Sequence, residues 1–217
     1  MKRAVLILGM VALLAAPAAP VAAQWLGEPV WNSPKGGTGL TIYADYGKPN
    51  DSYGSGNAFG GRVSLGLGTL TLTAGLSTYK DSLGPDRITS YGGNAEFRLI
   101  GGSLLPVAVN LQAGAARSDS ANSTAAQTVV TGAAGISVPL PTPGFSVEPY
   151  FSPGVRYRDF GSGNGSSTEF GYAIGANLSF GLLGVHLAYD NEKLKGGGSV
   201  GVFGVGAHVA IKLPLGM

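Results

Sequence analysis

Ten strand-length stretches in which apolar residues alternate with small or polar ones constrain the fold of this chain most strongly. Successive side chains of an extended strand point to opposite faces, so the alternation gives each stretch one apolar and one polar face. In the last stretch, one face carries Phe203 and Val205, and the other carries Gly204 and His208. The stretches span residues 39–48, 58–68, 70–80, 88–99, 106–117, 128–138, 146–158, 168–180, 184–193 and 200–213.

The connections between these stretches also alternate in character. Those after the odd-numbered stretches are polar, as in PNDSYGSGN, whereas those after the even-numbered ones are tight or apolar, as in the single Thr69. Short turns at one end and longer loops at the other are typical of bacterial outer-membrane barrels, whose tilted strands need about 9–11 residues to cross the bilayer. The pattern predicts an all-β, ten-stranded antiparallel up-and-down transmembrane β-barrel, with eight strands as the alternative.

The amino-terminal residues predict export. A basic pair, KR, precedes the apolar run AVLILGMVALLAA, and the small residues VAA end at Ala23. This is the pattern of a cleaved secretory signal peptide. We expect residues 1–23 to be the signal peptide, 24–36 a periplasmic N-terminal segment and 37–217 the barrel, located in the bacterial outer membrane.

The composition agrees with a barrel in a membrane. Glycine accounts for 37 of 217 residues, which disfavours helices, and only 12% of residues are charged, about half of the usual ~25%. Because 44% of residues are hydrophobic, something other than water is expected to cover part of the surface. The absence of cysteine excludes a disulfide-stapled scaffold, and a net charge of +2 gives no reason to expect a nucleic-acid partner.

The polar face collects the charged residues of the strands. With the apolar face toward lipid, these side chains line the lumen: Asp45, Arg62, Glu96, Arg98, Glu148, Arg156, Arg158, Glu169, His186, Asp190, His208 and Lys212. Many other inward positions are glycine or alanine, which leave volume. Two interpretations stay open, a narrow pore with charged walls or a lumen plugged by salt bridges. A soluble exported ligand-binding barrel, with the apolar face inside, would show the same alternation.

No catalytic or metal site is predicted. His186 and Asp190 share the inward face, and His208 lies on the neighbouring stretch, but no third metal ligand or positioned nucleophile accompanies them. We interpret them as part of a hydrogen-bond network in the lumen. The predicted function is a structural or narrow porin-like barrel for small solutes, without enzymatic activity or cofactor. The alternative is an outer-membrane enzyme acting on lipid or peptide.

A further set of cations has the parity of the lipid face but lies at or just beyond the outer ends of strands: Lys48, Lys80, Arg117, Lys193 and Lys195. One interpretation is ordinary snorkelling of long side chains toward water. The other is a basic rim that binds lipopolysaccharide phosphates.

The run EPYFSPGVRY, Glu148 to Tyr157, resembles a strand of the outer-membrane β-barrel superfamily that includes opacity-type and OmpA-like proteins. In that family three strands usually follow this one, as three stretches do here, so the resemblance covers residues 146–213. It implies insertion by the barrel-assembly machinery and contact with outer-membrane lipid. We expect a monomer without the separate peptidoglycan-binding domain that some relatives carry.

Overall fold

The computed structural model describes residues 31–50, 56–80, 85–102, 105–120, 126–161 and 165–211. The predicted signal peptide, residues 1–23, and Lys212 lie outside these ranges. No helix in the described ranges is long and apolar enough to cross a membrane. The strands are β1 (Thr38–Pro49), β2 (Asn57–Leu67), β3 (Leu70–Lys80), β4 (Ile88–Gly102), β5 (Leu105–Ser118), β6 (Gln127–Ser137), β7 (Leu140–Thr142), β8 (Phe145–Asp159), β9 (Ser166–Phe180), β10 (Leu183–Lys193) and β11 (Ser199–Ile211).

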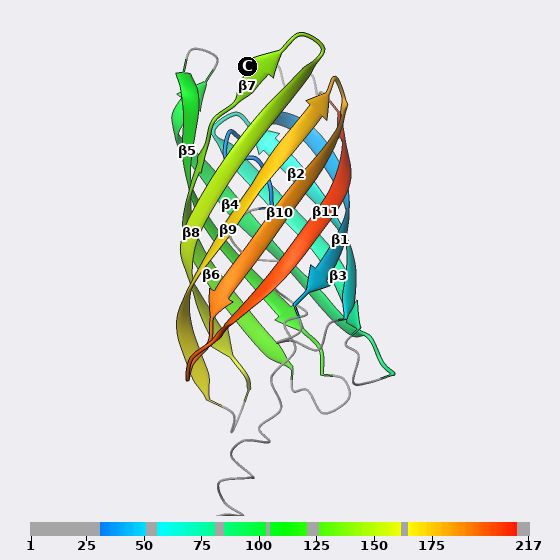
Figure 1. The fold of residues 1–217 in the computed structure, drawn as a ribbon, viewed down its shortest axis with the longest axis vertical. Coiled ribbons are helices and arrows are strands. Elements are labelled where there is room, and N and C mark those ends of the chain that lie inside the picture. The colour runs from blue at the N-terminus through cyan, green and yellow to red at the C-terminus, as the bar shows by residue number, and fades with distance from the viewer. Residues whose placement is uncertain are drawn as a thin grey trace, which may run out of the picture.

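Ten of these strands close into an antiparallel barrel (Figure 1). Each long strand pairs with its neighbours in the sequence, β1 pairs with β11, and β6 pairs with β8. The remaining strand, β7, is three residues long and pairs with β8 alone. The ten-stranded prediction is confirmed, and the eight-stranded alternative is wrong. We call the end of the barrel that carries β7 and the short connections the turn end, and the opposite end the loop end.

The predicted stretches match the long strands to within three residues at each boundary. The largest difference is at the turn end of β4 and β5, where the hairpin continues to Gly102 and the register shifts between Arg98 and Ile100. The pairing of β6 with β8 is interrupted at residues 152 and 153 of β8. Pro153 has no backbone N–H to donate to a ladder, which accounts for this interruption.

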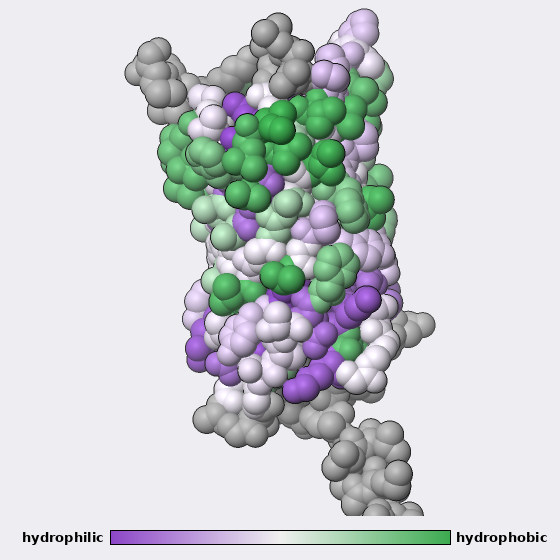
Figure 2. All heavy atoms as spheres, turned by 90° about the vertical axis from the view of Figure 1, so that its left-hand side faces the viewer, coloured by the Kyte–Doolittle hydropathy of each residue, from purple (hydrophilic) through white to green (hydrophobic). Residues whose placement is uncertain are grey.

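The barrel turns its apolar face outward. Large apolar side chains from the long strands are exposed, with Phe59 at 53% and Leu76 at 58%, while the alternate positions are buried. On the side shown in Figure 2, apolar side chains gather toward the turn end and hydrophilic ones toward the loop end. A soluble ligand-binding barrel requires the apolar face inside, so that alternative is wrong. An apolar exterior around a charged interior is the architecture of a transmembrane β-barrel.

Candidate functional site

Residues 31–36, just before β1, lie inside the barrel. The Asn32 side chain bonds to side chains of β2, β3 and β4, and the Ser33 hydroxyl donates to Glu148 of β8, on another wall. A segment that reaches all of these strands occupies the lumen. The periplasmic segment over residues 24–36 stays a prediction; among its described residues, Asn32, Ser33 and Lys35 form hydrogen bonds with the lumen wall.

Trp31 is the largest side chain that the structure buries completely, with 2% of its surface exposed. It belongs to an apolar cluster with residues of five strands: Ala116, Val129, Tyr150, Ala188 and Val202. Its ring also lies against Gly204 of β11, where a Cβ atom would come within 1.7 Å of the indole. Gly204 thus makes room for the indole and does not leave a water path there.

Arg62 of β2 is the centre of one polar group. Its Nε and Nη2 donate to the two oxygens of Asp45 at 2.6 and 3.0 Å, and its Nη1 donates to Asn32 Oδ1. His186 Nε2 lies 2.8 Å from Asp45 Oδ1, so three strands meet at this carboxylate. The guanidinium also lies over the Tyr43 ring, 4.4 Å from its centroid. All of these polar groups lie in the lumen, where the ion pair is shielded from water.

Glu96 of β4 forms a second group, linked to the first through the lumenal segment. Asn32 Nδ2 donates to Glu96 Oε1 at 3.1 Å and to Thr73 Oγ1 at 3.2 Å. Asn110 donates to Glu96 Oε2 at 3.4 Å and accepts from Gln112 at 2.8 Å. A single asparagine therefore bridges the positive Arg62 group and the negative Glu96 group.

Glu148 of β8 holds the next part of the segment. Its carboxylate accepts hydrogen bonds from the Ser33 hydroxyl, from Ser137 at 2.6 Å and from the backbone N–H of Lys35 at 3.2 Å. On the other side, Arg98 of β4 donates to the Lys35 carbonyl at 2.8 Å. Glu148 and Arg98, which were both predicted to face the lumen, thus form hydrogen bonds with the same short segment.

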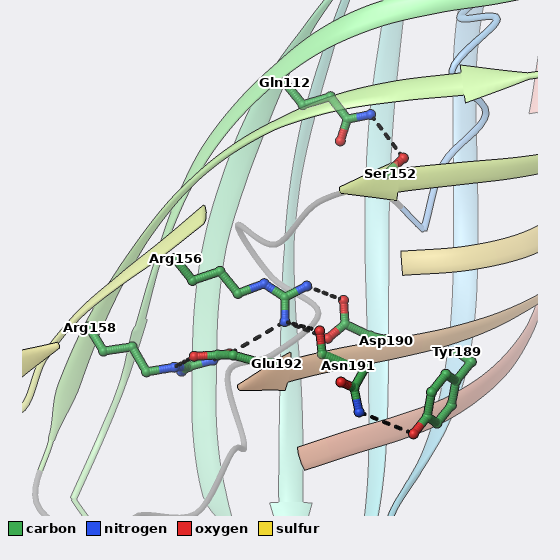
Figure 3. A network of polar contacts seen from close by, with 8 residues as sticks. All are labelled: Gln112, Ser152, Arg156, Arg158, Tyr189, Asp190, Asn191 and Glu192. Atoms are coloured by element: carbon green, nitrogen blue, oxygen red, sulfur yellow. Dashed lines mark hydrogen bonds and ion pairs between the residues drawn. The ribbon is translucent and has the colours of Figure 1, made fainter. Parts of the chain in front are cut away.

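A third charged group joins β8 to β10 (Figure 3). Arg156 Nη1 and Nη2 donate to the two Asp190 oxygens at 2.8 and 2.6 Å. Arg158 pairs with Glu192 through two contacts, and Arg156 Nη1 lies 3.4 Å from the same carboxylate. Arg156 and Asp190 have fully buried side chains. Two arginines and two carboxylates therefore neutralise each other in the wall of the lumen.

The remaining predicted lumenal residues are less enclosed. Arg98, Glu169 and His208 are half-buried. His208 lies beside His186 with ring centroids 6.4 Å apart and beside Tyr43 at 5.2 Å. The sequence interpretation missed Glu192, although it shares the parity of Asp190, and it missed Trp31 and Asn32, which precede the first alternating stretch.

The five predicted rim residues all have exposed side chains. They lie on different strands: Lys48 and Lys80 lie on β1 and β3, Arg117 lies on β5, and Lys193 and Lys195 lie at the β10 end. Arg87, which precedes β4, is exposed at the same end of the barrel and was not predicted.

The described residues contain no group of three or more His, Cys, Asp or Glu side chains that is placed to hold a metal ion. His186 contacts Asp45, Arg62 and two aromatic rings. In the described ranges no serine, threonine or lysine side chain hydrogen-bonds to either histidine. In the part of the chain that the structure describes, the charged groups of the lumen wall pair with one another and with residues of the segment before β1.

We predict that Asn32→Ala lowers the free energy of unfolding by about 2–3 kcal/mol, because Arg62 and Glu96 each lose a buried partner. Urea unfolding followed by circular dichroism measures this value. The matched control is Asn191→Ala on β10, whose side chain bonds to Tyr189 at the exposed surface and whose loss is expected to cost less than about 1 kcal/mol. Equal losses for the two variants would contradict the bridging role of Asn32.

No protein-family model and no curated protein matches the sequence. Among solved structures, the chain is similar to a bacterial polysaccharide outer membrane secretin, with 13% identity and a TM-score of 0.48; the match covers 73% of this chain and 57% of that chain. It is similar to the outer membrane enzyme PagL, with 14% identity, a TM-score of 0.47 and 79% and 99% coverage. It is also similar to Neisserial surface protein A, with 16% identity, a TM-score of 0.37 and 80% and 98% coverage. At these identities and TM-scores, none of the three assigns a function to this chain.

Proposed function

We propose that this protein is an outer-membrane β-barrel with a structural role, whose lumen is closed by its own residues 31–36 and by the charged groups of its wall. The observation that carries the proposal is the position of Trp31, which belongs to one buried apolar cluster with residues of β5, β6, β8, β10 and β11 inside the barrel. Asn32 and Ser33 fix the segment to β2, β3, β4 and β8. A narrow porin-like path for solutes would have to pass these groups.

A catalytic role has less support. The His186 and Asp45 pair resembles two parts of a nucleophilic triad, but Arg62 holds the same carboxylate through two hydrogen bonds. A hydrolase also needs a nucleophile within hydrogen-bond reach of the histidine and a place for the substrate. We therefore propose a non-enzymatic barrel, without cofactor.

The proposal predicts that the purified protein, refolded into a planar lipid bilayer, shows no discrete conductance steps. We expect no conductance steps because the side chains of Trp31 and Arg62 are buried inside the barrel, where we propose that they help to close the lumen. Circular dichroism and protease resistance of the same preparation establish that the barrel is folded. Regular steps from folded wild-type protein would instead support the porin-like function and overturn this one.

A further inference from the structure

A short row of cationic side chains crosses the outer surface at the loop end of β1 to β4. Lys48 and Lys80 are the outward-facing residues near the ends of β1 and β3, and Arg87 immediately precedes β4. Asn57 lies between the two lysine strands, at the start of β2. The backbone pairs that fix this common level are Gly47–Ala58, Asn57–Lys80 and Tyr79–Ile88.

Arg87 is held flat against the barrel. Its Nε donates to Thr78 Oγ1 at 3.0 Å, and its two Nη atoms donate to Asn57 Oδ1 at 3.3 and 3.2 Å. The guanidinium carbon lies 5.4 Å from the centroid of the Phe59 ring, within the range of a cation–π contact. One of the two Nη1 hydrogens keeps no partner among the described residues. A positive charge with a free donor is therefore fixed at this level.

The surface directly toward the turn end of this row is apolar and aromatic. Phe59 packs against Tyr46 with ring centroids 5.3 Å apart, and Leu76 and Tyr91 are more than half exposed. Aromatic residues above an apolar band mark the boundary between hydrocarbon and headgroups in transmembrane barrels. The cationic row thus sits where lipid headgroups begin.

The cationic side chains of this corner are suited to binding an anion. Of the described residues on the outer surface at this end of β1 to β4, Lys48, Lys80 and Arg87 are cationic, and Asp86 is acidic. Guanidinium and ammonium groups are the usual protein partners of phosphate. A free phosphate ion would make no use of the apolar surface beside them, whereas a lipid would place its acyl chains there.

We infer that Lys48, Lys80 and Arg87, with Phe59 beneath them, bind the phosphorylated headgroup of an outer-leaflet glycolipid. This inference rests on the proposed outer-membrane location, but it does not depend on whether the lumen is closed. It narrows the predicted five-residue rim to one corner of the barrel and adds Arg87 to it. The inference does not require that the other predicted rim residues, Arg117, Lys193 and Lys195, bind lipid.

The test is the affinity of the purified full-length protein in detergent for lipopolysaccharide, measured by isothermal titration calorimetry. The double variant Lys80→Gln/Arg87→Gln is expected to bind about tenfold more weakly or worse, since each cation near an anionic lipid surface contributes on the order of 1 kcal/mol. The matched control, Lys193→Gln/Lys195→Gln, removes the same charge at the β10 end and is expected to change affinity less than about threefold.

Three outcomes would overturn the inference. Unchanged affinity in the Lys80/Arg87 variant excludes the site, and equal losses in both double variants indicate general attraction to a basic surface. Displacement of lipopolysaccharide by inorganic phosphate at equal phosphate concentration indicates a site for the free ion. None of these outcomes depends on whether the barrel conducts ions. The test of lipopolysaccharide binding and the test of the closed lumen can therefore fail independently of each other.

Discussion

Arg156→Ala is expected to lower the free energy of unfolding by about 3–5 kcal/mol, the usual cost of removing one partner of a buried ion pair. Arg156 is completely buried and donates to both oxygens of Asp190, which is itself completely buried. Glu192 keeps Arg158 as a partner, but Asp190 loses its bidentate arginine. The penalty therefore comes from a carboxylate left in the lumen without its counter-charge. Urea unfolding in a defined detergent measures the difference from wild type.

Two comparisons separate this cause from a loss of packing. Arg117→Ala removes an exposed arginine from β5 and is expected to change stability by less than about 0.5 kcal/mol. Adding Asp190→Asn to the Arg156→Ala variant removes the uncompensated charge, so the double variant is expected to regain part of the loss. If the double variant is less stable than Arg156→Ala, packing rather than charge is responsible.

The barrel itself was predictable because its construction repeats every two residues. Each strand in a membrane barrel turns an apolar face to lipid and a face of small or polar residues to the lumen. The alternation therefore indicates both where a strand lies and which of its faces points outward. His186 and Asp190 are buried on one face of β10, while Leu187 and Tyr189 between them are exposed. The short strand β7 was not predicted because three residues are too few to show a period.

The contents of the lumen were not predictable in the same way. Ser33 and Glu148 are 115 positions apart in the sequence, and no local pattern in the segment before β1 indicates such a partner. The inward glycines were interpreted as free volume, yet a Cβ at Gly171 would come within 2.5 Å of the Arg156 guanidinium. A glycine on one strand leaves room for a large side chain from another part of the chain, and the sequence does not show which side chain that is.

Gly204→Ala is expected to displace the Trp31 indole and open a conducting path through a barrel that is silent in its wild-type form. The new methyl carbon would lie 1.7 and 1.9 Å from two carbons of the indole, distances that the ring cannot tolerate in its present position. The strand itself tolerates alanine, because Gly204 pairs regularly with Gly47 and Ala188 and its φ is not in the left-handed region. We therefore expect the barrel to stay folded while the Trp31 side chain moves.

Two measurements detect the displacement of the Trp31 indole. In a Trp25→Phe background, the fluorescence of Trp31 should shift to longer wavelength in the Gly204→Ala variant, because the indole leaves a site in which only 2% of its surface is exposed. Planar-bilayer recordings of the same variant should show discrete steps. Gly132→Ala is the matched control, since a Cβ there meets nothing within 4 Å, and it should remain silent with unshifted emission. A red-shifted but silent Gly204→Ala variant would mean that the charged wall closes the lumen without Trp31.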